Sequence, residues 1–422
     1  MKILWLVNIV MPELALHLGR KPSVFGGWLN GAMEAVKQSG HKLVVCTTEE
    51  NCTAQGRYAL ENATYYLTNR GELDAQRQDF RAILDDERPD VVHIYGTEFN
   101  HAWALAQEVE PERLLVTIQG SLHYIKEATY AGIPASICRD NWLHKLLRRL
   151  HKGGTSIDLQ KISFTQRAEL ECKVLRHAKY INGGSAWGRA VARSIHPDCV
   201  PLDCNLILRD SFYSGALWQP DTCEPHTIYA LFTYPVKGFH KLLEAMPIIL
   251  HRFPDAKIIA VGNRLQERRY GKLKTALMNK AQDYQWYVQN QIDTLGLKEH
   301  IEFVGYLDEP QVQQQLRRAN VFVSPSSIEN QSTALGEAMM LGVPCVASCV
   351  GAMQEMIDHG KDGFLYPFDA PYLLADHICR IFEDRALAER FSREGRAHAL
   401  RTYNREENCR KLLEMYETIA HC

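Results

Sequence analysis

The chain of 422 residues exceeds the size of a single hydrophobic core, so two domains are expected. Charged residues make up 23% and the net charge is −2, which excludes general nucleic-acid binding because that function needs a strong excess of Lys and Arg. No apolar run approaches the roughly 20 residues that span a bilayer, and the first ten residues are predicted to form a buried strand, so we expect a cytoplasmic protein.

Short apolar runs alternate with helical patterns throughout the first half of the chain. This alternation predicts a parallel sheet with helices on both faces. The predicted strands are Ile3–Val10, Lys42–Thr47, Val91–Tyr95, Leu114–Ile118 and Lys179–Asn182, and helical patterns include Gly27–Gln38 and His101–Val109.

A looser stretch, residues 211–226, is predicted to link this half to a second alternating region. The strands predicted there are Thr227–Phe232, Lys257–Val261, Ile301–Val304, Val321–Val323 and Cys345–Ser348. The polar helical stretch Arg268–Leu295 is predicted to elaborate the second domain. We therefore expect two doubly wound, Rossmann-like domains, 1–210 and 211–403, facing a cleft at the carboxyl ends of their strands.

The twelve cysteines are scattered, with no Cys-x-x-Cys pair. Several lie in apolar runs, which predicts buried thiols in a reducing compartment. No cluster of Cys and His has the spacing of zinc ligands, so no metal site is expected from them.

Two glutamates eight positions apart, Glu329 and Glu337, lie between two predicted strands. Ser324-Pro-Ser precedes them and Leu341-Gly-Val-Pro344 follows, which predicts one carboxylate in the turn that opens a helix and the other about two turns along it. A helix N-terminus can hold a diphosphate, and the carboxylates can accept hydrogen bonds from sugar hydroxyls on either side. The flanking residues favour a nucleotide-sugar site over two glutamates on a solvated helix.

This segment resembles the paired-glutamate motif of the retaining family-4 glycosyltransferases, which have the GT-B fold. The resemblance implies an α/β chain of two parallel-sheet domains, in which the C-terminal helix, within 404–422, crosses back onto the first domain. It implies that Glu329 binds the donor sugar and acts in catalysis, and that Glu337 holds the ribose. The resemblance also implies that backbone N–H groups bind the sugar and the diphosphate. These groups belong to Asn330, Gln331, Ser332 and Thr333.

Lys237-Gly238 follows a predicted strand and opens a predicted helix. A lysine there can neutralise charge that develops on a leaving diphosphate, although an exposed lysine at a helix start has the same pattern. The resemblance favours the first interpretation, because the family carries its phosphate-binding lysine at this position. The family's usual Arg a few residues earlier is missing, and Arg264 is the candidate replacement.

Three segments of the first domain carry further candidates by the same resemblance. Gly26 and Gly27 would lie over the diphosphate, although a plain loop has the same pattern. Gln119 stands where the family often has His and can hydrogen-bond the donor sugar without carrying charge. Glu98 and His101, after the strand that ends at Tyr95, are candidate acceptor-binding residues or a polar loop.

The segment 141–152 is basic and amphipathic. Such a helix can lie on an anionic membrane surface, although a core-facing helix with a solvated basic rim is the commoner source of this pattern. Many members of the family elongate lipid-linked glycans. The resemblance therefore implies peripheral contact of this segment with the inner face of the cell membrane.

We therefore predict a retaining glycosyltransferase that moves a sugar from a nucleotide-sugar donor to a glycan or lipid-linked acceptor, as in surface polysaccharide synthesis. The chain has no Asp-x-Asp, so we expect no metal, and no cofactor beyond the substrate. The alternatives are a nucleotide-sugar epimerase or phosphorylase on the same fold, or a non-catalytic relative that binds nucleotide sugars.

Overall fold

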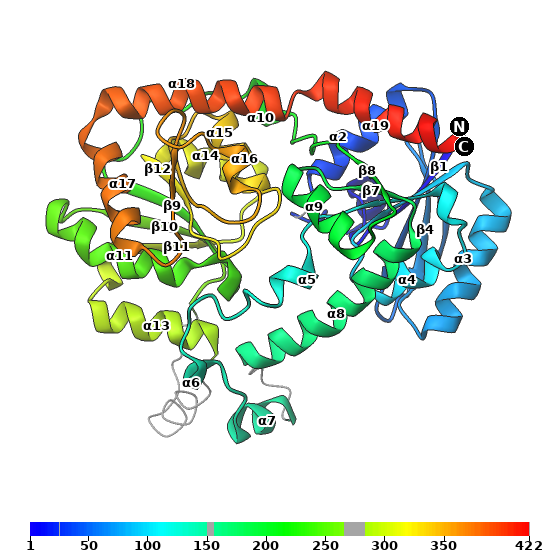
Figure 1. The fold of residues 1–422 in the computed structure, drawn as a ribbon, viewed down its shortest axis with the longest axis horizontal. Coiled ribbons are helices and arrows are strands. Elements are labelled where there is room, and N and C mark those ends of the chain that lie inside the picture. Colours follow the sequence, from blue (N-terminus) through cyan, green and yellow to red (C-terminus); the bar gives the residue numbers. More distant parts are fainter. Residues whose placement is uncertain (25, 150–155, 266–282, 422) are drawn as a thin grey trace. The chain divides into compact units, whose positions relative to one another are not determined.

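The computed structural model describes residues 1–24, 26–149, 156–265 and 283–421 (Figure 1). The chain forms two compact units. Unit 1 comprises residues 1–123, 166–211 and 402–422, and unit 2 comprises residues 124–165 and 212–401. Residues 124–165 were predicted to belong to the first domain, and they group with unit 2. The C-terminal segment groups with unit 1.

Unit 1 is built on an eight-stranded sheet with the order β3-β4-β2-β1-β5-β6-β7-β8. Its neighbouring strands run parallel except for the antiparallel pair β3–β4. The strands are β1 (Lys2–Leu6), β2 (Lys42–Glu49), β3 (Gly56–Ala59), β4 (Thr64–Asn69), β5 (Val91–Tyr95), β6 (Leu114–Thr117), β7 (Tyr180–Asn182) and β8 (Val200–Leu202).

Both faces of this sheet are buried, because successive side chains of a strand point to opposite faces. Leu4 and Leu6 of β1 belong to a core with α3, α4, α8 and α9, whereas Ile3 and Trp5 belong to a core with α1, α2 and α19. The helices of unit 1 are α1 (Pro12–His17), α2 (Trp28–Gln38), α3 (Leu73–Glu87), α4 (Asn100–Ala106), η1 (Pro111–Arg113), α9 (Ala186–Ile195) and α19 (Arg405–Ala420). Two more helices, α5 (Leu122–Ile125) and α8 (Ile157–His177), have residues in both units.

The C-terminal helix α19 is joined to the sheet of unit 1 by buried hydrogen bonds. The Tyr416 hydroxyl accepts a bond from Trp5 Nε1 at 2.9 Å and lies 2.8 Å from His93 Nδ1. His93 Nε2 in turn lies 2.7 Å from the Thr117 hydroxyl of β6. These bonds satisfy buried polar groups that would otherwise destabilise the core.

Unit 2 is built on an entirely parallel six-stranded sheet with the order β11-β10-β9-β12-β13-β14. Its strands are β9 (Thr227–Phe232), β10 (Lys257–Gly262), β11 (Ile301–Gly305), β12 (Val321–Ser324), β13 (Cys345–Ser348) and β14 (Phe364–Tyr366). Its helices are α6 (Ala135–Cys138), α7 (Trp142–Arg149), α10 (Ser211–Ser214), η2 (Pro235–Lys237), α11 (Phe239–Arg252), α13 (Tyr284–Leu295), η3 (Lys298–His300), α14 (Glu309–Arg318), α15 (Thr333–Met340), α16 (Met353–Met356), α17 (Pro371–Glu383) and α18 (Arg385–Thr402).

The expected doubly wound parallel sheets are present in both units. The first strand was predicted too long, because β1 ends at Leu6 and the chain leaves the sheet after Val7 donates to Cys46 O. Part of the predicted elaboration Arg268–Leu295, residues 268–282, lies outside the described residues, and the rest is α13. None of the described helices combines the length and apolar character needed to cross a bilayer.

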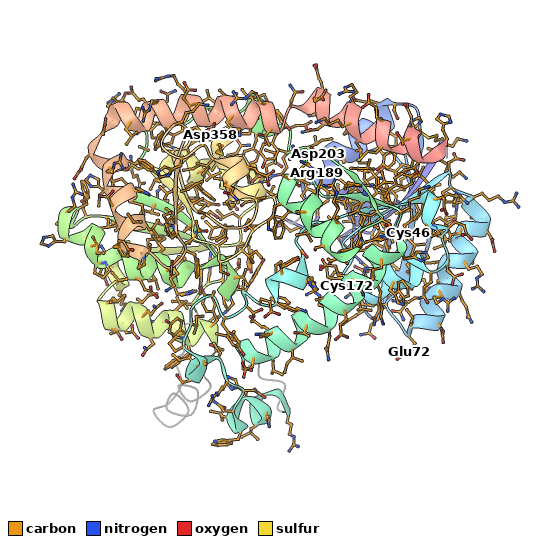
Figure 2. The ribbon with its side chains drawn as sticks, in the orientation of Figure 1. Cys46, Glu72, Cys172, Arg189, Asp203 and Asp358 are labelled. Atoms are coloured by element: carbon orange, nitrogen blue, oxygen red, sulfur yellow. The ribbon has the colours of Figure 1, made fainter. Side chains whose placement is uncertain are left out.

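The cysteines of the described part of the chain are free thiols. Cys46 on β2 and Cys172 on α8, both labelled in Figure 2, are buried, as expected for small apolar side chains. The predicted buried thiols are therefore present at these two positions.

Candidate functional site

The strand order of unit 2 creates a point where the chain reverses direction through the sheet. From β9 the chain adds β10 and β11 on one side, and it then returns to place β12 on the other side of β9. The chain therefore continues from β9 to β10 on one side and from β12 to β13 on the other, and ligands of open parallel sheets bind at the carboxyl ends of the strands at such a point. Lys237 follows β9 and Glu329 follows β12.

The structure brings these two residues into direct contact. Lys237 Nζ lies 2.5 Å from Glu329 Oε2, although 92 positions separate the residues in the chain. The Lys237 side chain is 20% exposed and the Glu329 side chain 13%, so the pair is shielded yet open to a ligand. The Ser326 hydroxyl donates to the same carboxylate oxygen at 3.1 Å.

Two close backbone approaches hold the loops of this pair together. Gly238 has φ +69°, and a Cβ there would lie 1.7 Å from Pro325 O, so the loop after β9 packs directly on the loop after β12. Gly351 has φ +53°, and a Cβ there would lie 2.0 Å from Glu329 O. Ser327 N also donates to Val236 O at 2.8 Å.

The charge on Lys237 is stabilised by its neighbours. Burial disfavours the charged amine, but the Glu329 carboxylate and Tyr234 outweigh it and hold the pKa of Lys237 above its usual value. The amine therefore stays protonated across the physiological range. It has three N–H donors, so it can keep Glu329 while donating to a further acceptor.

Helix α15 begins beside this pair, as the sequence predicts. The Ser332 hydroxyl is its N-cap and accepts a bond from Leu335 N at 3.4 Å. Glu337 lies inside the helix and is buried. The other predicted donor-binding residues lie in the turn before the helix or at its start: Asn330, Gln331 and Thr333.

Arg264 lies at the same edge of the sheet but is directed away from β12. Its guanidinium donates to Val304 O of β11 at 2.9 Å, and β11 lies beyond β10 and β9 as counted from β12. Next to it, the Tyr306 hydroxyl donates to Asn263 Oδ1 at 2.9 Å. The compensating role of Arg264 stays a prediction.

Unit 1 has its own reversal point, between β1 and β5. Asn8 follows β1 and His101 follows β5, and Asn8 Oδ1 lies 2.8 Å from His101 Nε2. Since a carbonyl oxygen only accepts, Nε2 donates, and Nδ1 accepts from the Thr48 hydroxyl at 3.2 Å. Burial, with a smaller effect of Arg70, lowers the pKa of His101 to about 3, so this centre is neutral.

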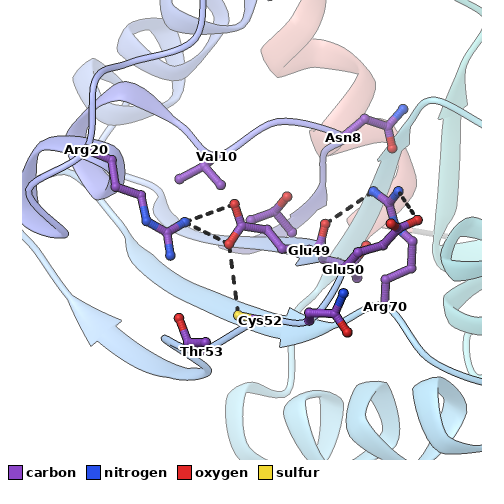
Figure 3. Close-up of a pocket in the computed structure, with 11 residues that line it drawn as sticks. Asn8, Val10, Arg20, Glu49, Glu50, Cys52, Thr53 and Arg70 are labelled. Atoms are coloured by element: carbon purple, nitrogen blue, oxygen red, sulfur yellow. Dashed lines mark hydrogen bonds and ion pairs between the residues drawn. The ribbon is translucent and has the colours of Figure 1, made fainter. Parts of the chain in front are cut away.

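A pocket of about 520 Å³ opens beside this centre, at the carboxyl ends of β1, β2 and β4 (Figure 3). Arg20 donates to both oxygens of Glu49, at 2.9 and 2.7 Å, and Arg70 lies 3.9 Å from Glu50. The two arginines thus balance the two glutamates. The remaining lining side chains are mostly neutral and polar: Asn8, Thr47, Thr48, Asn51 and Thr53, with Val10 and Cys52.

The other predicted residues of unit 1 occupy varied environments. Gln119 is exposed, two positions after β6 ends. Glu98 is paired with Arg167 at 2.8 Å. Gly26 has φ +73°, and Gly27 lies so close to Arg209 that a Cβ would meet its Cδ at 2.5 Å. Their roles toward a ligand stay predictions.

Among the described residues, Asp358, Asp362 and His398 form a group whose ligand atoms lie within 4.8 Å of one another. His398 Nδ1 already lies 2.7 Å from Asp362 Oδ2, and Lys361 Nζ lies 3.0 Å from Asp358 Oδ2. The members of this group, on the loop before β14 and on α18, therefore already have protein partners. It does not include Glu329 or Glu337.

The described part of the basic amphipathic segment is α7. Trp142 is 64% exposed and Leu146 is 42% exposed, one turn apart. Lys145 and Arg149 are exposed on the same helix. Residues 150–152, and the side chains of Leu147 and Arg148, lie outside the described residues.

Sequence reasoning missed several contributors to these sites. Asn8 was placed inside a strand, and its position one residue beyond the apolar run Ile3–Val7 was the available signal. Thr48 gave no signal of its own, because its partner His101 is 53 positions away, and Ser326, only three positions before Glu329, was not singled out as a partner of that carboxylate.

Residues 224–398 match the model of the family "Glycosyl transferases group 1". The chain is 29% identical over 218 residues to a phosphatidyl-myo-inositol mannosyltransferase of Mycobacterium tuberculosis, over 50% of this chain and 52% of that protein. It is 25% identical over 193 residues to spore coat protein SA of Bacillus subtilis, over 43% and 46%. The chain thus spans about half the length of the curated relatives it matches.

Solved structures match over nearly the whole chain. Sucrose-phosphate synthase from Thermosynechococcus elongatus has a TM-score of 0.70 at 18% identity, over 99% of this chain and 98% of that one. Anabaena HepE in complex with UDP-glucose has a TM-score of 0.65 at 15% identity, over 99% of both chains. At these identities the likeness shows the fold alone, and it confirms the predicted GT-B architecture of two parallel-sheet α/β units.

Proposed function

We propose that the chain, whose residues 224–398 match the model of the group 1 glycosyltransferases, is a retaining, metal-independent enzyme of family 4. It transfers a sugar from a nucleotide-sugar donor to a glycan or lipid-linked glycan, in surface polysaccharide synthesis. The observation that carries the proposal is the 2.5 Å contact of Lys237 with Glu329, at the reversal point of the unit 2 sheet and beside the start of α15. Anabaena HepE, a structural neighbour, binds UDP-glucose.

The proposed donor lies across the carboxyl ends of β9 and β12. Glu329 accepts hydrogen bonds from sugar hydroxyls, and Glu337 from the ribose. Lys237 and the N–H groups at the start of α15 hold the diphosphate, where a fixed cation and the helix dipole favour negative charge. As the sugar–phosphate bond breaks, negative charge grows on the leaving phosphate. Lys237 interacts more strongly with this charge in the transition state than with the diphosphate in the ground state, and so lowers the barrier.

The acceptor attacks from the face that the diphosphate leaves, and the leaving phosphate oxygen takes the acceptor's proton. The sugar's configuration is retained, and no protein nucleophile is required. The side chains of Lys237 and Glu329 therefore position and stabilise charge, without forming a covalent bond.

We propose the charge-balanced pocket of unit 1 as the acceptor site. Its asparagines and threonines both donate and accept hydrogen bonds, which suits the hydroxyls of a sugar. His101 fixes Asn8 and Thr48 and so acts on the acceptor through them. A neutral ring such as inositol or a hexose fits this balance better than an anion.

The exposed face of α7 is proposed to touch the membrane that carries a lipid-linked acceptor. Trp142 and Leu146 can enter the headgroup boundary while Lys145 and Arg149 meet anionic lipid, each adding about 1 kcal/mol. Trp142→Ala/Leu146→Ala should pellet several-fold less with phosphatidylglycerol vesicles, while Tyr372→Ala, which removes another exposed aromatic, should pellet normally. If wild type, Trp142→Ala/Leu146→Ala and Tyr372→Ala pellet equally, α7 does not contact the membrane.

The proposal is tested by screening nucleotide sugars for a thermal shift and then assaying the stabilising one for transfer. A new glycoside with the anomeric configuration of the donor is the expected product. Isomerised nucleotide sugar without acceptor would identify an epimerase instead. Binding with neither hydrolysis nor transfer to any acceptor would identify a non-catalytic relative.

A further inference from the structure

A buried carboxylate of unit 1 joins the two loops that carry the predicted ligand-binding residues of that unit. Glu171, on α8, is fully buried. One of its oxygens accepts from Leu122 N at 3.2 Å and from the Thr97 hydroxyl at 3.5 Å. The other accepts from His123 N at 2.9 Å and from the Ser121 hydroxyl at 3.4 Å. Figure 2 labels the next residue of α8, Cys172.

These partners lie in loops with proposed functions. Thr97 belongs to the loop after β5, beside Glu98 and before His101. Ser121 belongs to the loop after β6, which includes the exposed Gln119. Leu122 and His123 are the first residues of α5, and the chain leaves unit 1 directly after His123. One carboxylate therefore fixes both loops at the carboxyl edge of the sheet.

We propose that Glu171 is a positioning residue for sugar transfer, holding the loops after β5 and β6 in their productive arrangement as a carboxylate. The inference rests on the proposed function, because Gln119 and His101 have ligand-binding roles only if the chain transfers a sugar. A carboxylate is required because both of its oxygens accept from backbone N–H groups. Protonation puts a hydrogen on one oxygen, and either Leu122 N–H or His123 N–H then faces a hydroxyl oxygen, which accepts more weakly than a carboxylate oxygen.

The surroundings of Glu171 place this change near neutral pH. Burial raises the pKa of Glu171 to about 7, against the N–H groups of His123 and Leu122 that lower it. The Glu98 carboxylate raises the pKa further, and Ser121 lowers it. The other ionisable groups nearby are Arg167, which pairs with Glu98, and the His123 ring, whose Nδ1 lies 3.5 Å from Cys172 Sγ.

Activity and stability should respond to pH in opposite directions. The folded-state pKa lies above the ordinary value of 4.5, so the neutral form stabilises the fold, and this stability is lost as pH rises through about 7. Activity should rise over the same window, because the carboxylate is the form that holds both loops. A purely structural carboxylate would change stability alone.

The test compares the pH profiles of kcat in wild type, Glu171→Gln and Glu169→Gln, an exposed change on the same helix. Wild type and Glu169→Gln should lose activity as pH falls through about 7. Glu171→Gln should lack this limb and have kcat about tenfold lower at pH 8, the effect of one charged hydrogen bond. Donor affinity, set in unit 2, should stay within about twofold. Persistence of the acid limb in Glu171→Gln would overturn the proposal.

If Glu171→Gln does not fold, the proposal can still be tested with a second variant and a second measurement. Ser121→Ala removes a bond that favours the charged form, so it should move the acid limb to higher pH. Hydrogen exchange at the Leu122 and His123 amides should show protection that weakens below pH 7 in wild type and is constant in Glu171→Gln. Protection of this kind without any sugar transfer would refute the proposed function alone, whereas transfer with unchanged protection would refute the role of Glu171.

Discussion

The reversal points of the two units share a topology and differ in charge. In unit 2 the loops after β9 and β12 meet in an ion pair, Lys237 with Glu329. In unit 1 the loops after β1 and β5 meet in neutral hydrogen bonds, Asn8 with His101, and the pocket beside them has balanced charges. The same sheet edge thus offers a fixed cation in one unit and neutral polar groups in the other. The difference suits a charged donor and a neutral acceptor.

Removing the ion pair should have the largest effect. Lys237→Met and Glu329→Gln should each lower the transfer rate at least about 100-fold, because each removes a group that stabilises developing charge or holds the sugar. Lys257→Met, an exposed change at the opposite end of the sheet, should retain the wild-type rate. Initial rates at saturating donor measure the loss.

The double variant separates function from stability. A single change leaves one charge poorly compensated in a shielded site, so each variant should also unfold at a lower temperature. Lys237→Met/Glu329→Gln removes both charges and should recover much of that stability while staying inactive. Recovery of activity in the double variant would show that the pair serves only the fold.

The sequence predicted the architecture because the long buried strands keep their apolar pattern. Thr227–Phe232 and Val91–Tyr95 were predicted with the bounds that the structure gives to β9 and β5. The strands β7, β8 and β14 have three residues each, too short for a period to be counted, and only β7 was predicted. The antiparallel strand β3 alternates between exposed and half-buried residues and left no apolar run.

The candidate site was predicted less evenly than the fold. Lys237 and Glu329 were joined by family resemblance, since their 92-residue separation hides the contact from local patterns. The direction of Arg264 depends on strand order, which alternation of strands and helices does not determine. The burial of His101 depends on Asn8 and Thr48, each more than 50 positions away. Tertiary contacts, and not local sequence, decide such features.

An intermediate effect should follow from unbalancing the unit 1 pocket. Glu49→Gln leaves Arg20 without its carboxylate partner and gives the pocket a net positive charge. The KM for a neutral acceptor should rise about tenfold, because the side chains lose their arrangement, while the donor KM stays unchanged. Glu72→Gln, an exposed change in unit 1 without a side-chain cap bond, is the matched control. Tighter acceptor binding in Glu49→Gln would indicate an anionic acceptor.

The smallest effect is expected from removing the N-cap of one helix in each unit. Ser332 caps α15 and Ser185 caps α9, each accepting a bond from the backbone N–H three residues ahead. Replacing either serine with alanine should destabilise its own unit by about 1 kcal/mol, the usual cost of a lost N-cap. Only Ser332→Ala should also weaken nucleotide-sugar binding, by roughly fivefold, because α15 alone is proposed to direct its N–H groups at the diphosphate.

Calorimetric titration of both variants with the stabilising nucleotide sugar measures this difference. Equal affinities in Ser332→Ala and Ser185→Ala would mean that the start of α15 does not hold the donor. The assignment of the anionic ligand to unit 2 would then depend on Lys237 alone. Because both variants lose the same kind of bond, a change in affinity confined to Ser332→Ala cannot come from the loss of an N-cap in general and is specific to the start of α15.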